Sequence, residues 1–114
     1  MNDKEKYAIS KMIEYIDKSI NYTNGLSYEL FEQDSKTQDA TIFNISQIGE
    51  LVKEISENTM VKYNTIEWRM MKGLRNRIIH DYSGINLTNI WYVIQNDLPT
   101  LKENLMQIQK DNEL

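Results

Sequence analysis

The sequence contains 114 residues, of which 40% are hydrophobic and 26% charged, and its formal net charge is −4. This length and composition predict one folded domain over residues 1–114 and exclude an intrinsically disordered chain. With no cysteine and a single histidine, the chain has no disulfide scaffold, no thiol nucleophile and no site that needs two imidazoles from one chain. The acidic balance argues against a protein that coats nucleic acid by bulk charge.

No segment is typical of an export signal or a membrane span. The first six residues alternate in charge, and the longest uninterrupted hydrophobic run, residues 90–94, contains five residues. A spanning helix requires roughly 20. We therefore expect a cytoplasmic protein without a membrane partner.

Two long helices are predicted in the first half of the chain. The first is capped by Asn2 or Asp3 and ends at Asn24-Gly25, since glycine commonly follows a helix C-terminus. Residues 27–31 predict a short additional helical turn, and the second long helix is predicted over residues 35–57. In both long helices hydrophobic residues recur at intervals of three and four, which predicts one apolar face on each.

The second half of the chain predicts two more helices. Residues 58–64 predict a loop, after which Thr65 caps a third helix that continues through Ile78 and is closed by Ser83-Gly84. A fourth helix begins near Thr88 and contains Pro99, which must kink it or start a new helix, because proline lacks an N–H and clashes with the preceding turn. No segment shows the alternation of a strand. The predicted fold class is all-α, an up-and-down four-helix bundle with a short extra helix.

Two glycines fall inside the predicted helices, where each costs up to about 1 kcal/mol relative to alanine. Gly49 lies in the second helix and Gly73 in the third. A glycine at such a position permits close approach, either of a ligand or of a neighbouring helix. We favour close helix packing at both positions.

Positive charge is concentrated around the single histidine. The three arginines of the chain, Arg69, Arg75 and Arg77, lie within nine residues, and His80 follows at once. Residues 62–80 carry five basic side chains and one acidic side chain, a balance of +4, so the remainder of the chain carries −8. An acidic protein with this asymmetry can present a local positive field to an anionic ligand.

An imidazole beside guanidinium groups suits phosphodiester cleavage without a metal or a cofactor. His80 can move the proton of a ribose 2′-hydroxyl or of the leaving oxygen, and Arg75 can neutralise charge that builds on phosphate. Asn76, Arg77 and Lys72 are predicted to assist or to bind RNA phosphate. On a helix Arg75 lies about 140° round the axis from His80, which favours convergence with a second copy across a two-fold axis.

A purely structural interpretation of the same residues is also open. Arg75 and Arg77 can pair with Asp81 or with acidic residues of another helix, such as Glu50, and a histidine near a helix end is commonly a capping or surface residue. On this interpretation, the protein is a dimeric helix bundle in which the arginine cluster has a structural role.

Residues 75–82, Arg-Asn-Arg-Ile-Ile-His-Asp-Tyr, match the Arg-x4-His-x-Tyr signature of the HEPN superfamily, and the chain resembles its HepT-like toxins. Asn76 fits the polar position after the arginine. The resemblance extends over nearly the whole chain and includes three further segments: Trp68-Arg69, Ile48-Gly49-Glu50 and Asp97-Leu98-Pro99.

The resemblance implies an all-α HEPN domain that forms a homodimer and cleaves RNA, with Arg75 and His80 as the catalytic pair. It also implies an antitoxin partner, a nucleotidyltransferase of the MntA type, which transfers AMP to Tyr82 in a type VII-like toxin–antitoxin module. The alternative function is a non-catalytic, nucleotidyltransferase-associated subunit that binds a substrate or nucleotide.

Overall fold

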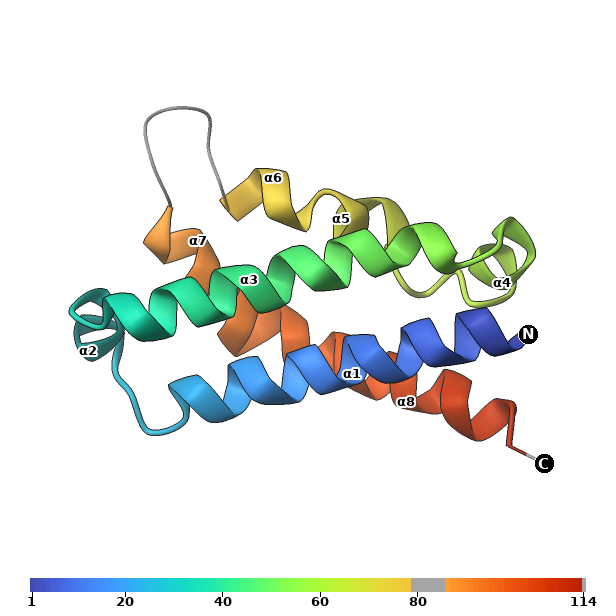
Figure 1. The fold of residues 1–114 in the computed structure, drawn as a ribbon, viewed down its shortest axis with the longest axis horizontal. Helices are drawn as coiled ribbons and strands as arrows, with labels where there is room; N and C mark the ends of the chain where they lie inside the picture. The colour runs from blue at the N-terminus through green and yellow to red at the C-terminus, as the bar shows by residue number, and fades with distance from the viewer. Residues whose placement is uncertain (79–85, 114) are drawn as a thin grey trace.

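The computed structural model describes residues 1–78 and 86–113, and within these ranges the regular elements are all helical, which confirms the all-α class. The elements follow in the order α1 (Asp3–Thr23), α2 (Tyr28–Glu32), α3 (Ser35–Leu51), the 3-10 turn η1 (Val52–Glu54), α4 (Glu57–Lys62), α5 (Trp68–Lys72), α6 (Leu74–Ile78), α7 (Leu87–Tyr92), the π-helical turn η3 (Val93–Asp97) and α8 (Leu98–Asp111). Figure 1 shows α1 and α3 side by side along the length of the molecule, with α8 packed against α1. None of the described helices is long and apolar enough to cross a membrane.

Helix α1 begins and ends where the sequence predicts. The Asn2 Oδ1 accepts a 2.8 Å hydrogen bond from the Glu5 N–H, and the Glu5 carboxylate accepts one from the Asn2 N–H, which together form a capping box. At the other end Gly25 has a φ of 81°, a left-handed conformation that glycine adopts without a steric penalty.

The second long helix ends earlier than predicted, and the predicted loop at 58–64 is largely helical. Helix α3 stops at Leu51, η1 turns the chain, and Ser56 then caps α4, where its Oγ accepts from the Thr59 N–H. The Glu5 carboxylate accepts a 2.7 Å hydrogen bond from the Ser56 N–H and a 2.9 Å bond from the Thr59 hydroxyl. Both expectations were wrong because a side chain 51 residues away fixes this turn.

The predicted third helix is divided into two short ones. Helix α5 begins at Trp68, with Glu67 rather than Thr65 at the N-cap, and Gly73 separates it from α6. Gly73 is therefore not inside a helix, contrary to the prediction. Gly49 is within α3, and a Cβ there would lie 3.0 Å from the Met71 carbonyl oxygen. Close packing of α3 against α5 therefore requires glycine at position 49, as predicted.

The predicted fourth helix begins at Leu87 and contains an irregularity before its proline. Helix α7 passes into the π-helical turn η3, and α8 starts at Leu98 with Pro99 in its first turn. Proline is tolerated in the first turn of a helix because its missing N–H has no partner there. Of the two outcomes predicted for Pro99, a kink or a new helix, the structure shows the start of a helix.

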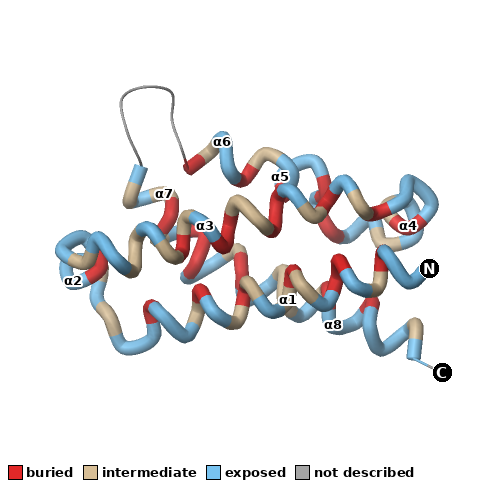
Figure 2. Tube along the Cα trace, viewed as in Figure 1, coloured by how far each residue is buried: buried red, intermediate tan, exposed pale blue. Residues whose placement is uncertain are grey.

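The helices bury one continuous hydrophobic core. In Figure 2 the buried segments of α1, α3 and α8 lie along their facing sides. At the α2 end, Phe31 is fully buried and its ring centroid lies 5.2 Å from that of Trp91. This core supports α5, α6 and η3, the elements that carry the candidate site.

Candidate functional site

The basic segment is fixed to the bundle through its apolar residues. Trp68, Met71, Leu74 and Ile78 are buried, at spacings of three and four, and they hold α5 and α6 against α3. This packing leaves Lys72, Arg75 and Asn76 exposed. The predicted catalytic Arg75 and two of the three residues predicted to assist or to bind phosphate, Lys72 and Asn76, are therefore accessible on the surface of the bundle, whereas the third, Arg77, is partly buried.

Arg75 lies beside α3, next to Glu50. Both residues line a shallow hollow that also includes Lys53. The Lys53 Nζ donates a 2.7 Å hydrogen bond to Glu50 and holds the pKa of that carboxyl below its usual value, and Arg75 adds to this lowering. Within the described residues Arg75 has no ion pair, so the predicted alternative pairing with Glu50 is taken by Lys53 instead.

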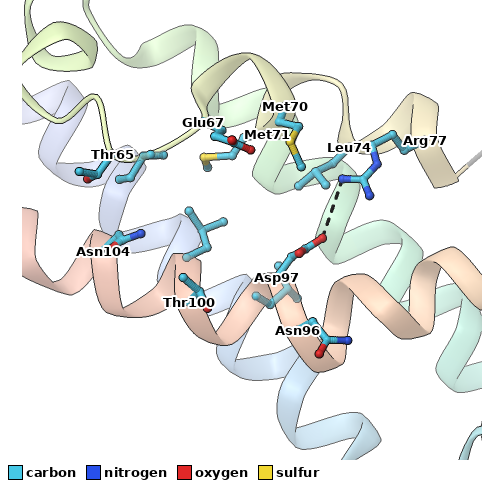
Figure 3. Close-up of a pocket in the computed structure, with 13 residues that line it drawn as sticks. Thr65, Glu67, Met70, Met71, Leu74, Arg77, Asn96, Asp97, Thr100 and Asn104 are labelled. Atoms are coloured by element: carbon cyan, nitrogen blue, oxygen red, sulfur yellow. Dashed lines mark ion pairs between the residues drawn. The ribbon is translucent and has the colours of Figure 1, made fainter.

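Arg77 lies on a different side of α6, toward η3. Its Nη1 is 3.8 Å from the Asp97 Oδ2, and the two side chains are 35% and 34% exposed (Figure 3). This ion pair joins α6 to the start of α8, as the structural interpretation of the arginines predicted for an acidic residue of another helix. Arg75 and Arg77 therefore do not converge, because residues two apart on a helix lie about 200° apart.

A pocket of about 240 Å³ opens beside the Arg77–Asp97 pair, between α5–α6 and η3–α8. One wall contains the apolar side chains of Met70, Met71 and Leu74. The facing wall is more polar and contains three residues spaced by four: Asn96, Thr100 and Asn104. No role is predicted for these three residues from the sequence, and their helical spacing of four is the signal that could have grouped them.

His80 and Tyr82 lie outside the described residues, as do Asp81 and the predicted helix end at Ser83-Gly84. The geometry around the histidine is therefore an expectation from the sequence. In residues 1–78 and 86–113 no group of three or more His, Cys, Asp or Glu side chains is placed to hold a metal ion.

The helical fold and the arginine-bearing signature define a member of the HEPN class of helical domains. A family model described as "Ribonuclease HepT-like" matches residues 12–108. The chain belongs to this family.

Relatives and solved structures agree with this assignment. The chain is 38% identical over 94 residues to a candidate RNase of Methanocaldococcus jannaschii, with 82% of this chain and 78% of the relative covered. It is 32% identical over 110 residues to a Thermococcus cleftensis protein named "Probable ribonuclease HepT", with 96% of this chain and 100% of the relative covered.

The fold matches that of a tri-AMPylated Shewanella oneidensis HEPN toxin, solved in complex with an MNT antitoxin, at a TM-score of 0.71. That match has 23% identity and covers 96% of this chain and 99% of the toxin. A toxin–antitoxin structure with AMP-PNP gives the same TM-score at 22% identity, with 96% of this chain and 98% of the solved chain covered. At these identities the likeness establishes the fold.

Proposed function

We propose that the chain is a metal-independent endoribonuclease, the toxin of a toxin–antitoxin module, in which Arg75 and His80 are the catalytic residues. The observation that carries the proposal is the match to the ribonuclease HepT-like family together with an exposed arginine at the first position of the signature. The relatives with ribonuclease names and the solved toxin–antitoxin complexes support it.

The proposed reaction is attack of a ribose 2′-oxygen on the adjacent phosphorus. The 2′-hydroxyl proton passes to water, the bond between phosphorus and O5′ breaks, and protonated His80 donates its proton to O5′ as a general acid. Arg75 stabilises the negative charge that develops on the phosphoryl oxygens. The products are a 2′,3′-cyclic phosphate and a 5′-hydroxyl.

The proposal includes a site shared by two copies of the chain. Arg75 faces α3 in the described part of the chain, and its helical offset from His80 is better met by the histidine of a second copy. Mixing Arg75→Ala with His80→Ala protein tests this arrangement. Hybrid dimers should contain one intact site, and the mixture should recover about a quarter of the wild-type activity; no recovery from two folded variants would contradict a shared site.

Control by a partner is the last part of the proposal. A nucleotidyltransferase of the MntA type would transfer AMP to Tyr82, since the tyrosine at position 82 matches the signature and a solved relative of the same fold is AMPylated. The added phosphate and purine would block RNA by charge and bulk. After co-expression with such an enzyme, intact-mass and peptide spectra should assign AMP to Tyr82, and AMP found only on other tyrosines would refute this part.

The nuclease assignment is tested by incubating purified protein with RNA in the presence of EDTA. We expect cleavage with 2′,3′-cyclic phosphate ends, lost in His80→Ala and retained in Arg69→Ala, a matched loss of charge at an exposed position of the same segment. Cleavage that persists in His80→Ala, or that requires a divalent metal, would overturn the assignment. No cleavage combined with nucleotide binding would instead favour the non-catalytic subunit.

A further inference from the structure

We propose that the pocket between α5–α6 and η3–α8 binds a single unstacked nucleobase of RNA and that it prefers guanine. The proposal rests on the proposed function and deepens it, because it assigns a base-specificity site to the ribonuclease. The chemistry of the pocket walls, the charge of the lining and the long Arg77–Asp97 ion pair support this assignment.

Two buried polar atoms beside the pocket have unused hydrogen-bonding capacity. The Arg77 Nη1 and the Asp97 Oδ2 are both shielded from solvent, and neither has a hydrogen-bond partner among the described residues. Their separation of 3.8 Å is too long for a hydrogen bond between them. The two side chains are otherwise about one-third exposed, so a rotation that opens this long pair would present a donor and an acceptor side by side to a ligand in the pocket and satisfy both.

The size and walls of the pocket fit a small planar ring. Pockets for drug-sized ligands have volumes of about 300–1,000 Å³, and this one, at about 240 Å³, suits a smaller group. Met70, Met71 and Leu74 form an apolar wall, while Asn96 and Asn104 lie opposite on the polar wall (Figure 3). Adaptable methionine side chains make favourable contacts with aromatic faces. The Asn104 amide can bond to the ring edge, whereas the Asn96 Nδ2 donates to the Tyr92 carbonyl oxygen.

The charge of the lining excludes phosphate as the preferred occupant. Arg77 is the single cation among the lining residues, whereas Glu67 and Asp97 are both acidic. A lining with two carboxylates and one guanidinium repels an anion and accepts a neutral ring with polar edges. We therefore assign Arg77 to a base rather than to phosphate, and leave phosphate binding to the exposed Lys72, Arg75 and Asn76.

Guanine matches the unpartnered pair better than the other bases. Its O6 is an acceptor that lies next to two N–H donors, at N1 and N2. Arg77 would donate to O6, the commonest arginine contact with this base, and the Asp97 carboxylate would accept from N1 and N2. Single-stranded RNA is typically read in this way, from the edges of splayed-out bases.

The backbone places Asp97 for this contact. The residue ends the π-helical turn η3, immediately before α8 and its Pro99. Insertion of a π turn shifts the residues that follow round the helix axis, and such turns are frequent at functional sites.

Titration of mononucleotides into protein labelled at the methionine ε-methyl groups tests the proposal. We expect GMP to shift the Met70 and Met71 signals, while Met12 in the core and the exposed Met106 of α8 stay unchanged. AMP, CMP and UMP carry the same phosphate and should bind more weakly, and ribose 5-phosphate should leave both pocket signals in place.

Variants then test the base contact. Asp97→Asn should weaken GMP binding by about tenfold or more, the discrimination expected from a bidentate base contact. Thr100→Trp should fill the pocket and abolish binding, which keeps the test decisive if Asp97→Asn is poorly folded. Glu103→Gln removes an exposed carboxylate of α8 outside the pocket and should leave binding unchanged.

Three results would overturn the inference: no shift of Met70 or Met71 with any mononucleotide, equal shifts with ribose 5-phosphate, or GMP binding that Asp97→Asn does not weaken. Mononucleotides contain no phosphodiester to cleave, so this readout is independent of nuclease activity. GMP binding without RNA cleavage would support the base-binding pocket and contradict the ribonuclease function. RNA cleavage without GMP binding would support the ribonuclease function and contradict the base-binding pocket.

Discussion

Two carboxylates join distant segments of this bundle, and they differ in how completely their oxygens are satisfied. Glu5, 3% exposed, accepts hydrogen bonds of 2.7–3.1 Å from Asn2, Ser56 and Thr59. Asp97, 34% exposed on its side chain, faces Arg77 at 3.8 Å, and its Oδ2 has no hydrogen bond. The carboxylate oxygens of Glu5 are used for hydrogen bonds that stabilise the fold. In our proposal, the carboxylate of Asp97 accepts hydrogen bonds from a ligand.

The same contrast applies to the elements around each carboxylate. Glu5 fixes the junction between the regular helix α1 and the start of α4, where caps satisfy the backbone. Asp97 belongs to the irregular region, in which Gly73 interrupts a helix and η3 is a π turn. Stability and binding are thus assigned to different helix junctions, and the variants below test that division.

The largest effect on stability is expected from Glu5→Gln. Burial by itself raises the pKa of Glu5, but the hydrogen bonds from Ser56, Asn2 and Thr59 outweigh it and lower the pKa to about 2. A shift from the ordinary 4.5 to about 2 corresponds to roughly 3 kcal/mol. Denaturant unfolding at pH 7 should show a loss of this order in the free energy of unfolding.

The pH dependence of unfolding isolates the contribution of the Glu5 carboxylate to the free energy of unfolding. Because the folded pKa is depressed, its stabilisation is fully present above about pH 4.5 and is lost as the pH falls toward 2. Wild-type protein should therefore lose stability across this window, and Glu5→Gln should show a flatter profile. Parallel profiles for the two proteins would contradict the role of Glu5.

Gly49→Ala should have an intermediate effect. The new methyl group would lie 3.0 Å from the Met71 carbonyl oxygen, a backbone atom that can move only with α5. Overpacking of this kind typically costs about 1–3 kcal/mol, in spite of the higher helix propensity of alanine. A variant as stable as wild type, or more stable, would show that α3 and α5 are less closely packed than described.

Asp97→Asn should have the smallest effect on stability. Its Oδ2 has no hydrogen bond to lose, and the ion pair with Arg77 is long, with each side chain about one-third exposed. Thermal and denaturant unfolding should change by less than about 1 kcal/mol, the upper value for an ion pair near the surface, because the two charged groups are too far apart to share a hydrogen bond. A loss of unfolding free energy comparable with that of Glu5→Gln would show that Asp97 stabilises the fold as Glu5 does, and would contradict the difference between the two carboxylates.

Local signals in the sequence predicted α1 correctly because its determinants are neighbours. Asn2 and Glu5 form the capping box, and Gly25 ends the helix, all within the segment itself. The stop of α3 and the formation of α4 could not be predicted in this way, since the Glu5–Ser56 hydrogen bond connects residues far apart in the chain.

The candidate site was predictable in part for the same reason. The clustering of Arg75 and Arg77 is visible in the sequence, and the helix period predicts that they diverge. The partner of Arg77 could not be identified, because Asp97 comes from an element that meets α6 only in the folded chain. The pocket beside this pair likewise depends on the break at Gly73 and the π turn, which no hydrophobic period indicates.

The most direct test of the account measures RNA cleavage in EDTA by Arg75→Ala beside its thermal unfolding. We expect activity to fall by about 100-fold or more, the usual effect of removing one charge-stabilising donor, while the unfolding midpoint stays at the wild-type value because Arg75 is exposed. Arg69→Ala should retain both properties. Full cleavage by Arg75→Ala, or a loss of cleavage that merely follows a loss of folded protein, would contradict the account.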